Sequence, residues 1–333
     1  MGEKMRTKKS GMNYLVPILI SGLMLMFIFA VGCTPNNAGD AKAKGSNQLR
    51  IGSLPIEDNL PILVALQNGY FAAENLDVQL IPFQSPVESQ SAFQSGELDG
   101  MVTDMLIAAL LRSSGEDLRI TSLTLGATPA EGRFAIVASP QSNIFSPSDL
   151  KGKSIGISTN SIIEYVTDGL LEEAGLKPSD VEKIVTPKIP VRIEMLLSNQ
   201  IDAITVPDPH VSYVVAEGAK VIAEDTQGEN LTQAVLIMTN KTLDTKKESM
   251  VRFYKAYTQA VEDINSAPEE YRELLLKNVN IPPKIADTYQ VQHYSKPQLP
   301  AEKEVNKVLT WLKNKNLLKN EVTYEGLIQK GLY

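Results

Sequence analysis

The stretch SGELDG at residues 95–100 has a counterpart, SNQIDA, at residues 198–203, an offset of 103. Two strand-like segments keep almost the same spacing, because Ile51 in RIG matches Ile155 in SIG at an offset of 104. Chance similarity among α/β segments is the alternative explanation. Because an aspartate and the spacing recur together, the sequence favours a structural repeat of about a hundred residues in each half.

Each half of this repeat alternates expected strands with expected helices. The first helix is expected to begin at Asn59, with the asparagine side chain as its cap and Pro61 in its first turn. The expected strands are 49–52, 77–81, 98–102, 153–157 and 181–185, and the expected helices between them include 87–93 and 162–171. Such alternation predicts parallel strands with helices on the faces of the sheet.

Two further expected strands, 118–125 and 234–239, carry the chain out of the first half and back again. We therefore expect a second lobe at 134–232, inserted into a first lobe made of 49–133 and 233–333. The fold class is α/β, with two lobes that each contain a helix-flanked, mostly parallel sheet. The two crossings, near 131–133 and 230–233, are expected to form a hinge that closes both lobes around a ligand.

The amino-terminal residues predict export. Four basic side chains precede an uncharged run from Tyr14 to Gly32, which ends at Cys33, the only cysteine of the chain. This order is typical of a secretory signal, and a cysteine after small residues predicts a lipoprotein that is cleaved before Cys33 and lipidated there. Residues 34–48 are polar and are expected to form a flexible tether. An uncleaved transmembrane anchor is the alternative.

Composition predicts an ordinary globular protein beyond the tether. The chain has 333 residues, of which 43% are hydrophobic and 21% charged. Residues 1–33 carry four basic side chains and one acidic one, so the formal net charge of −7 becomes −10 without them. This negative charge argues against nucleic acid as a partner. We expect a monomer that faces away from the cytosol and is held at the membrane by lipid.

A family resemblance is distributed over nearly all of residues 49–333. The chain resembles the solute-binding proteins of the NMT1/THI5 and aliphatic-sulfonate group, although Asn75 stands where that group usually has glycine. The residues that carry the resemblance are 51–55, Pro61, Ala65, 69–71, 76–78, 95–99, 149–153, 175–176, 311–312 and 324–325. The resemblance implies a periplasmic-binding-protein fold of the second type. It also implies delivery of a small solute, such as a sulfonate, taurine, nitrate or a thiamine-pyrimidine precursor, to an ABC permease with a separate ATPase subunit.

Ligands of open α/β sheets bind beyond the carboxyl ends of the strands. Polar residues there, together with an arginine near the hinge, are the ligand-binding candidates: Asp58, Asn59, Ser85, Asp104, Arg133, Ser158, Thr159, Asn160 and Asp208. The alternative for most of them is helix capping, with Ser161 and Glu164 as a capping box, and for Arg133 an ion pair at the hinge. Because acids outnumber bases, a ligand rich in N–H donors, such as an aminopyrimidine, is favoured over a bare anion.

Enzymatic chemistry is not indicated. The two histidines, His210 and His293, lie far apart. His210, near the proposed cleft, is interpreted as a surface-loop residue, with a ligand contact as the alternative. No G-x-S-x-G or P-loop spacing occurs, and neither a metal nor a cofactor is expected. Tyr70, Tyr254 and Tyr257 are interpreted as core residues. An exported enzyme on the same scaffold and a tethered ligand sensor remain the alternatives to a solute receptor.

Overall fold

The computed structural model describes residues 47–228 and 231–333. The expected leader, the lipidation site Cys33 and nearly all of the expected tether lie outside these residues, as does Asn230 of the second expected crossing. In the described part of the chain, no helix is both long enough and apolar enough to cross a membrane.

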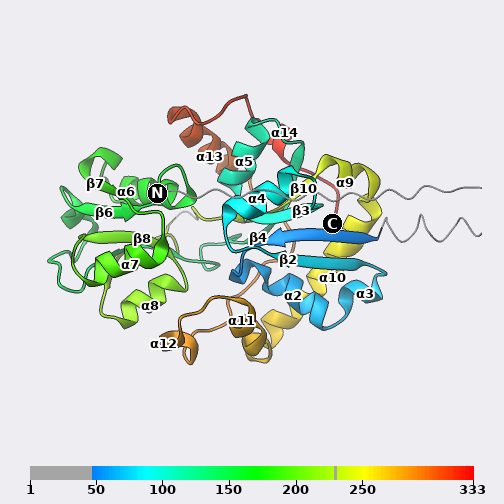
Figure 1. Ribbon diagram of the computed structural model, residues 1–333, viewed down its shortest axis with the longest axis horizontal. Coiled ribbons are helices and arrows are strands. Elements are labelled where there is room, and N and C mark those ends of the chain that lie inside the picture. Colours follow the sequence, from blue (N-terminus) through cyan, green and yellow to red (C-terminus); the bar gives the residue numbers. More distant parts are fainter. Residues whose placement is uncertain (1–46, 229–230) are drawn as a thin grey trace, which may run out of the picture. The chain divides into compact units, whose positions relative to one another are not determined.

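Five strands form the first sheet, in the order β2-β1-β3-β10-β4 (Figure 1). Their bounds are β1 Gln48–Ser53, β2 Asp77–Pro82, β3 Gly100–Asp104, β4 Leu118–Leu125 and β10 Ala234–Thr239. β1 pairs in parallel with β2 and β3, whereas β10 is antiparallel to β3 and β4. Four strands of this sheet therefore run in one direction, and β10, which arrives from much later in the sequence, runs against them.

The second sheet repeats this plan with strands from the middle of the chain, in the order β7-β6-β8-β5-β9. Their bounds are β5 Phe134–Ala138, β6 Ser154–Ile157, β7 Glu182–Val185, β8 Ala203–Pro207 and β9 Lys220–Glu224. β6 is parallel to β7 and β8, and β5 is antiparallel to β8 and β9. Here too the reversed strand, β5, lies in the fourth position.

The matched aspartates explain why the repeat is visible in the sequence. Asp99 accepts a hydrogen bond from the main-chain N of Arg50 at 2.9 Å, and Asp202 accepts one from the main-chain N of Ser154 at 2.9 Å. Asp99 thus joins the turn before β3 to the neighbouring strand β1, and Asp202 joins the turn before β8 to the neighbouring strand β6. The repeat is confirmed, and its conserved spacing reflects one strand connection that is built twice.

Helices cover both sheets (Figure 1). Their bounds are α2 Leu60–Gln67, α3 Tyr70–Ala73, α4 Pro86–Gln94, α5 Met105–Ser113, α6 Ile162–Glu173, α7 Ile189–Leu197, α8 His210–Ala216, α9 Asn240–Thr245, α10 Lys247–Ser266, α11 Arg272–Asn278, α12 Pro283–Ala286, α13 Glu302–Asn314 and α14 Tyr324–Leu327. Short 3₁₀ turns are η1 Glu57–Asn59, η2 Pro147–Leu150, η3 Pro178–Asp180 and η4 Pro268–Tyr271.

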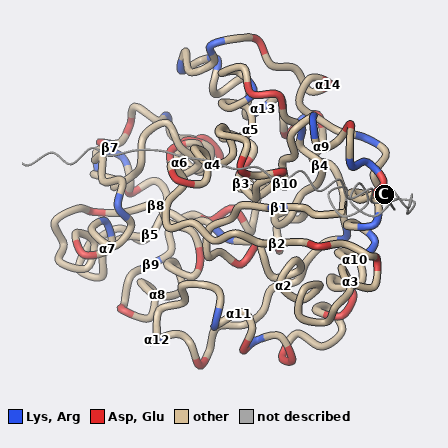
Figure 2. The backbone as a smooth tube through the Cα atoms, turned by 45° about the vertical axis from the view of Figure 1, so that its right-hand side comes forward, with Lys and Arg blue, Asp and Glu red and all other residues tan. Residues whose placement is uncertain are grey.

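Lys and Arg are interspersed with Asp and Glu along the chain (Figure 2).

The long helix α10 provides much of the core beside the first sheet. It packs on α2 and α3, and the ring of Phe253 stacks on Phe71 with centroids 5.0 Å apart. Tyr254 and Tyr257 of the same helix are buried, and their rings meet edge to face. The interpretation as core residues is confirmed for Tyr254 and Tyr257, because burial of their large rings stabilises the packing of helix on sheet. Tyr70, in contrast, is only half-buried at the edge of this core, and its hydroxyl donates to Asp263.

Two expected helix caps are wrong. Asn59 begins α2 without a side-chain cap, because it already ends the turn η1 and has helical dihedral angles. Its amide instead accepts a hydrogen bond from Ser53 Oγ at 2.5 Å and donates to the Leu54 carbonyl at 2.6 Å. At α6, Glu164 accepts from the main-chain N of Asn160 rather than from Ser161, so no capping box forms.

Helix α13 contacts helix α6, although the two helices flank different sheets. The indole N–H of Trp311 in α13 donates to Asp168 of α6 at 3.0 Å. The Trp311 ring also meets Tyr165 edge to face, with centroids 5.6 Å apart. Next to it, Lys315 forms an ion pair with Glu164. These contacts fasten the last long helix of the chain to the part built around the second sheet.

Candidate functional site: a carboxylate cluster at the strand ends

Carboxylates from both sheets gather where the strands end. Glu57 and Asp58 follow β1, Asp104 ends β3 and Asp208 follows β8. Their charges act on one another, because Asp104 raises the pKa of Asp58 and Asp208 raises the pKa of Glu57. The structure therefore brings together three of the predicted residues, Asp58, Asp104 and Asp208, and adds Glu57. No group of three or more His, Cys, Asp or Glu residues within the described residues is arranged to hold a metal ion.

Glu57 lies deepest in this cluster, with 6% of its surface exposed. Its carboxyl group accepts hydrogen bonds from Tyr289 Oη at 2.8 Å and from Gln292 Nε2 at 2.6 Å, and its main-chain oxygen accepts one from Tyr294 at 2.9 Å. Burial, reinforced by the charge of Asp58, raises the pKa of Glu57 to about 8. Glu57 therefore carries a proton at neutral pH.

Asp58 and Asp104 are half-buried and closer to ionisation. Burial raises the pKa of each to about 6, and the charge of Asp104 contributes to the shift of Asp58. Asp104 also caps α5, because its Oδ1 accepts from the main-chain N of Ile107 at 2.8 Å. At neutral pH both carboxylates are mainly ionised and act as hydrogen-bond acceptors.

Arg133 lies at the first crossing between the sheets and pairs with acids there. Its Nη2 is 2.6 Å from Glu224 Oε2, and its Nη1 is 3.7 Å from Asp208 Oδ2. Asp208 also accepts a hydrogen bond from the main-chain N of Ser212 at 2.8 Å. The ion pair that was the alternative role of Arg133 is thus present, and Arg133 links the crossing to the carboxylate cluster.

The segment Ser158–Thr159–Asn160 lies at the end of β6 and is backed by a buried cation. Thr159 and Asn160 are exposed, and Asn160 has a positive φ of 53°. Ser158 Oγ accepts a hydrogen bond from Arg192 Nη2 at 2.7 Å. Arg192 is fully buried, and its other donors reach the carbonyl oxygens of Thr186 at 3.0 Å and Thr205 at 2.6 Å. Burial lowers the pKa of Arg192 to about 10.

Two other predicted residues are engaged at their own loops. Asn59 is buried and braces the loop after β1, as described above. Ser85 caps α4, because its Oγ accepts from the main-chain N of Glu88 at 3.3 Å. The structure therefore does not bring either side chain into the carboxylate cluster through a direct contact.

The interpretation of His210 as a surface-loop residue is wrong. His210 is the first residue of α8 and is half-buried, and its Nδ1 is buried without a hydrogen-bond partner. Burial lowers the pKa of its ring, and the charge of Asp208 partly opposes that shift. His293, in contrast, is largely exposed, with Nδ1 3.6 Å from Glu131 Oε1.

Sequence reasoning missed Glu57, Arg192 and the residues that bind Glu57. Arg192 could have been found, because it shares the buried face of α7 with Ile193 and Leu196. An arginine on an apolar helical face is uncommon and indicates a specific buried partner. Tyr289 and Gln292 lie in an irregular segment without periodicity, so no pattern identifies them.

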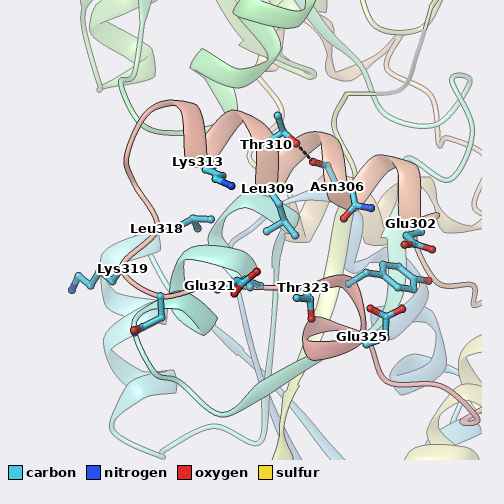
Figure 3. Close-up of a pocket in the computed structure, with 13 residues that line it drawn as sticks. Glu302, Asn306, Leu309, Thr310, Lys313, Leu318, Lys319, Glu321, Thr323 and Glu325 are labelled. Atoms are coloured by element: carbon cyan, nitrogen blue, oxygen red, sulfur yellow. Dashed lines mark hydrogen bonds between the residues drawn. The ribbon is translucent and has the colours of Figure 1, made fainter.

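Two cavities differ in whether the predicted ligand-binding residues line them. A groove of about 540 Å³ is lined by Arg133, Asp208 and Ser212 on one side and by Tyr289 and Gln292 on the other. A larger cavity of about 690 Å³ lies between α13 and residues 318–325, and Figure 3 shows its lining side chains. None of the predicted ligand-binding residues lines this larger cavity. The groove beside the carboxylates is therefore the better candidate for the ligand entrance.

Comparison with known proteins extends this picture. The family model described as NMT1/THI5 like matches residues 57–271. The formylaminopyrimidine-binding protein of Halalkalibacterium halodurans is 24% identical over 273 residues, which are 78% of each chain. The periplasmic aliphatic sulphonate binding protein SsuA from Escherichia coli has a TM-score of 0.71 at 19% identity, over 85% of this chain and 97% of that one. The desulfurization enzyme DSZB has a TM-score of 0.65 at 17% identity, over 86% and 97%. These neighbours have the periplasmic-binding-protein fold, so the predicted fold class is confirmed.

Proposed function

The chain belongs to the NMT1/THI5-like family, and on this premise we propose that it is the solute-binding component of an ABC importer. Its ligand is a small polar organic molecule rich in N–H donors, of the aminopyrimidine class. The observation that carries this proposal is the cluster of Glu57, Asp58, Asp104 and Asp208 at the ends of strands from both sheets. The ionised carboxylates of Asp58 and Asp104 accept hydrogen bonds from amino groups, whereas they repel the oxygens of a sulfonate.

The proposed mechanism is capture between two lobes, with a first lobe at 49–133 and 233–333 and a second lobe at 134–232. Closure is driven by contacts that the ligand makes better in the closed state than in the open one. Residues 1–33 contain the signal peptide, which is cleaved before Cys33, and Cys33 carries lipid. The expected tether, residues 34–48, ends where β1 begins at Gln48 and holds a monomeric receptor outside the cytosol. The closed form then docks on a permease that works with a separate ATPase subunit, and no nucleic acid takes part.

Ligand binding is expected to raise the melting temperature of the purified chain. Formylaminopyrimidine at 100 times its dissociation constant should stabilise the protein by about 2.7 kcal/mol. Asp58→Asn removes a half-buried charge of the cluster and should weaken this effect, whereas Asp244→Asn, at an exposed position of α9, should leave it unchanged. Ethanesulfonate serves as the comparison ligand. Stabilisation by the sulfonate alone would overturn the ligand class proposed here.

A second candidate function is enzymatic, because DSZB shares the fold and is an enzyme. The two functions differ in what happens to a bound compound. A receptor returns formylaminopyrimidine unchanged after prolonged incubation, whereas an enzyme converts it to a product that chromatography and mass spectrometry detect. Recovery of a product from the purified protein, absent with heat-denatured protein, would favour the enzyme.

Lobe movement is expected to alter the fluorescence of Trp311. This residue is the only tryptophan in the chain and joins α13 to Asp168 and Tyr165 of α6. A rotation of one lobe against the other changes the surroundings of the indole, so ligand addition should shift its emission maximum. Trp311→Phe should abolish the signal while the thermal shift persists. Unchanged emission alongside a clear thermal shift would mean that this contact does not move.

A further inference from the structure

The amide of Gln233 is buried and makes no hydrogen bond. Only 2% of the residue surface is exposed, and neither Nε2 nor Oε1 has a partner. Buried polar groups in folded proteins are nearly always hydrogen-bonded, because a buried group left without a partner loses its hydration and gains nothing in return. Among the residues that the structure describes, Gln233 is the one in which both polar atoms of a side-chain amide are left in this state.

Gln233 lies at the edge of the first sheet where β3 ends at Asp104. Strand β10 begins at the next residue, Ala234, which pairs with Asp104 at the end of β3 and with Leu125 at the end of β4. Thr124 lies at the irregular step of the β10–β4 pairing, and its Oγ1 is likewise buried without a partner. Gln233 thus directly precedes the strand partner of Asp104, and Thr124 lies one strand further along the same sheet, beside β10.

We propose that Gln233 is a ligand-recognition residue of the cleft, assisted by Thr124. This inference rests on the proposed function and adds which hydrogen-bonding groups must lie side by side on one edge of the ligand. A glutamine amide presents a carbonyl acceptor beside an N–H donor, so it forms two parallel hydrogen bonds with an amino group that adjoins a ring nitrogen. Aminopyrimidines have such an edge. A sulfonate has acceptors only and leaves the amide carbonyl unmatched.

The location of Gln233 in the return crossing explains how a ligand reaches a buried amide. The two crossings are tied together by Asp225, which accepts hydrogen bonds from the main-chain N of Phe134 at 2.8 Å and from Thr232 Oγ1. Gln233 follows Thr232 directly, between this tie and β10. In this proposal, lobe opening about the crossings exposes the amide to the ligand, and closure brings the amide and the ligand together.

Gln233→Met tests the inference through two measurements, because the variant should keep or gain thermal stability without ligand and should lose affinity for the ligand. Methionine has a similar length and no strong hydrogen-bonding group, so the ligand-free variant should melt at a temperature equal to or above that of wild type, since an unpaired amide is removed. Its dissociation constant for formylaminopyrimidine, measured by calorimetry, should rise by about tenfold to a hundredfold. Gln67→Met, at an exposed position of α2, is the matched control and should change neither value.

The outcomes separate this inference from the proposed function. A lower melting temperature of ligand-free Gln233→Met would mean that the amide is satisfied without ligand, and unchanged affinity would remove its role in recognition. Either result overturns the inference while the receptor function stands. A wild-type protein that binds no formylaminopyrimidine overturns both. Thr124→Val, which replaces the hydroxyl by a methyl group of equal size, gives a second variant, and its affinity should fall about threefold to tenfold.

Discussion

Arg192→Met is expected to lower the free energy of unfolding by about 3 kcal/mol. The guanidinium is fully buried and donates to Thr186 O, Thr205 O and Ser158 Oγ. Each buried acceptor left without a donor costs about 1–3 kcal/mol. Burial of the Arg192 charge costs free energy, which is why burial lowers the pKa of Arg192 to about 10. Removal of this charge in the variant therefore offsets part of the loss. Chemical denaturation followed by circular dichroism measures the net effect.

Two variants identify the cause of this loss. Arg192→Lys keeps a positive charge but lacks the planar fork that reaches several oxygens at once, so it should recover only part of the stability. Arg112→Met is the control, because Arg112 pairs with Asp117, whose side chain is 67% exposed, and such surface pairs contribute at most about 1 kcal/mol. Full stability of Arg192→Met would show that the three oxygens find other donors.

Glu57→Gln is expected to remove a fall in stability between pH 6 and pH 8. The folded state holds the proton of Glu57 up to about pH 8, whereas the unfolded chain releases it near pH 4.5. Between these values the folded state binds more protons, so the stabilising contribution is complete below pH 4.5 and is lost as the pH rises through 8. From pH 6 to pH 8 the wild-type protein should lose about 2 kcal/mol from this residue.

Neighbouring groups do not mask the effect of Glu57 in this window. Asp58, Asp104 and Asp225 also have raised pKa values, but these lie at about 6, so their contributions change mainly below the window. The lowered pKa of His210 acts in the opposite direction below pH 6.5 and is retained in the variant. Glu97→Gln, at an exposed turn, should keep the wild-type pH profile. An identical slope in Glu57→Gln would mean that Glu57 ionises normally.

The repeat, the α/β fold class and the family could all be predicted from the sequence, whereas the order of the strands within each sheet came from the structure. SGELDG and SNQIDA recur because each aspartate makes the same hydrogen bond to the main chain of a neighbouring strand, Asp99 to Arg50 of β1 and Asp202 to Ser154 of β6. The resemblance to the NMT1/THI5 group is confirmed by the family match over residues 57–271. The lobe boundaries, the lipidation of Cys33 and the ligand contacts remain predictions.

The charge states and partners of the site were decided by tertiary structure alone. Glu57 meets Tyr289 and Gln292, which are more than two hundred residues away in the sequence, and burial raises its pKa through surroundings that no local pattern records. Asn59 and Ser161 match cap signals, yet their side chains bond within the preceding loops. The physical reason is the separation along the sequence over which each effect acts. Periodicity and turn chemistry act between neighbours along the chain, whereas desolvation and hydrogen-bond partners in a cleft depend on segments that meet only after folding.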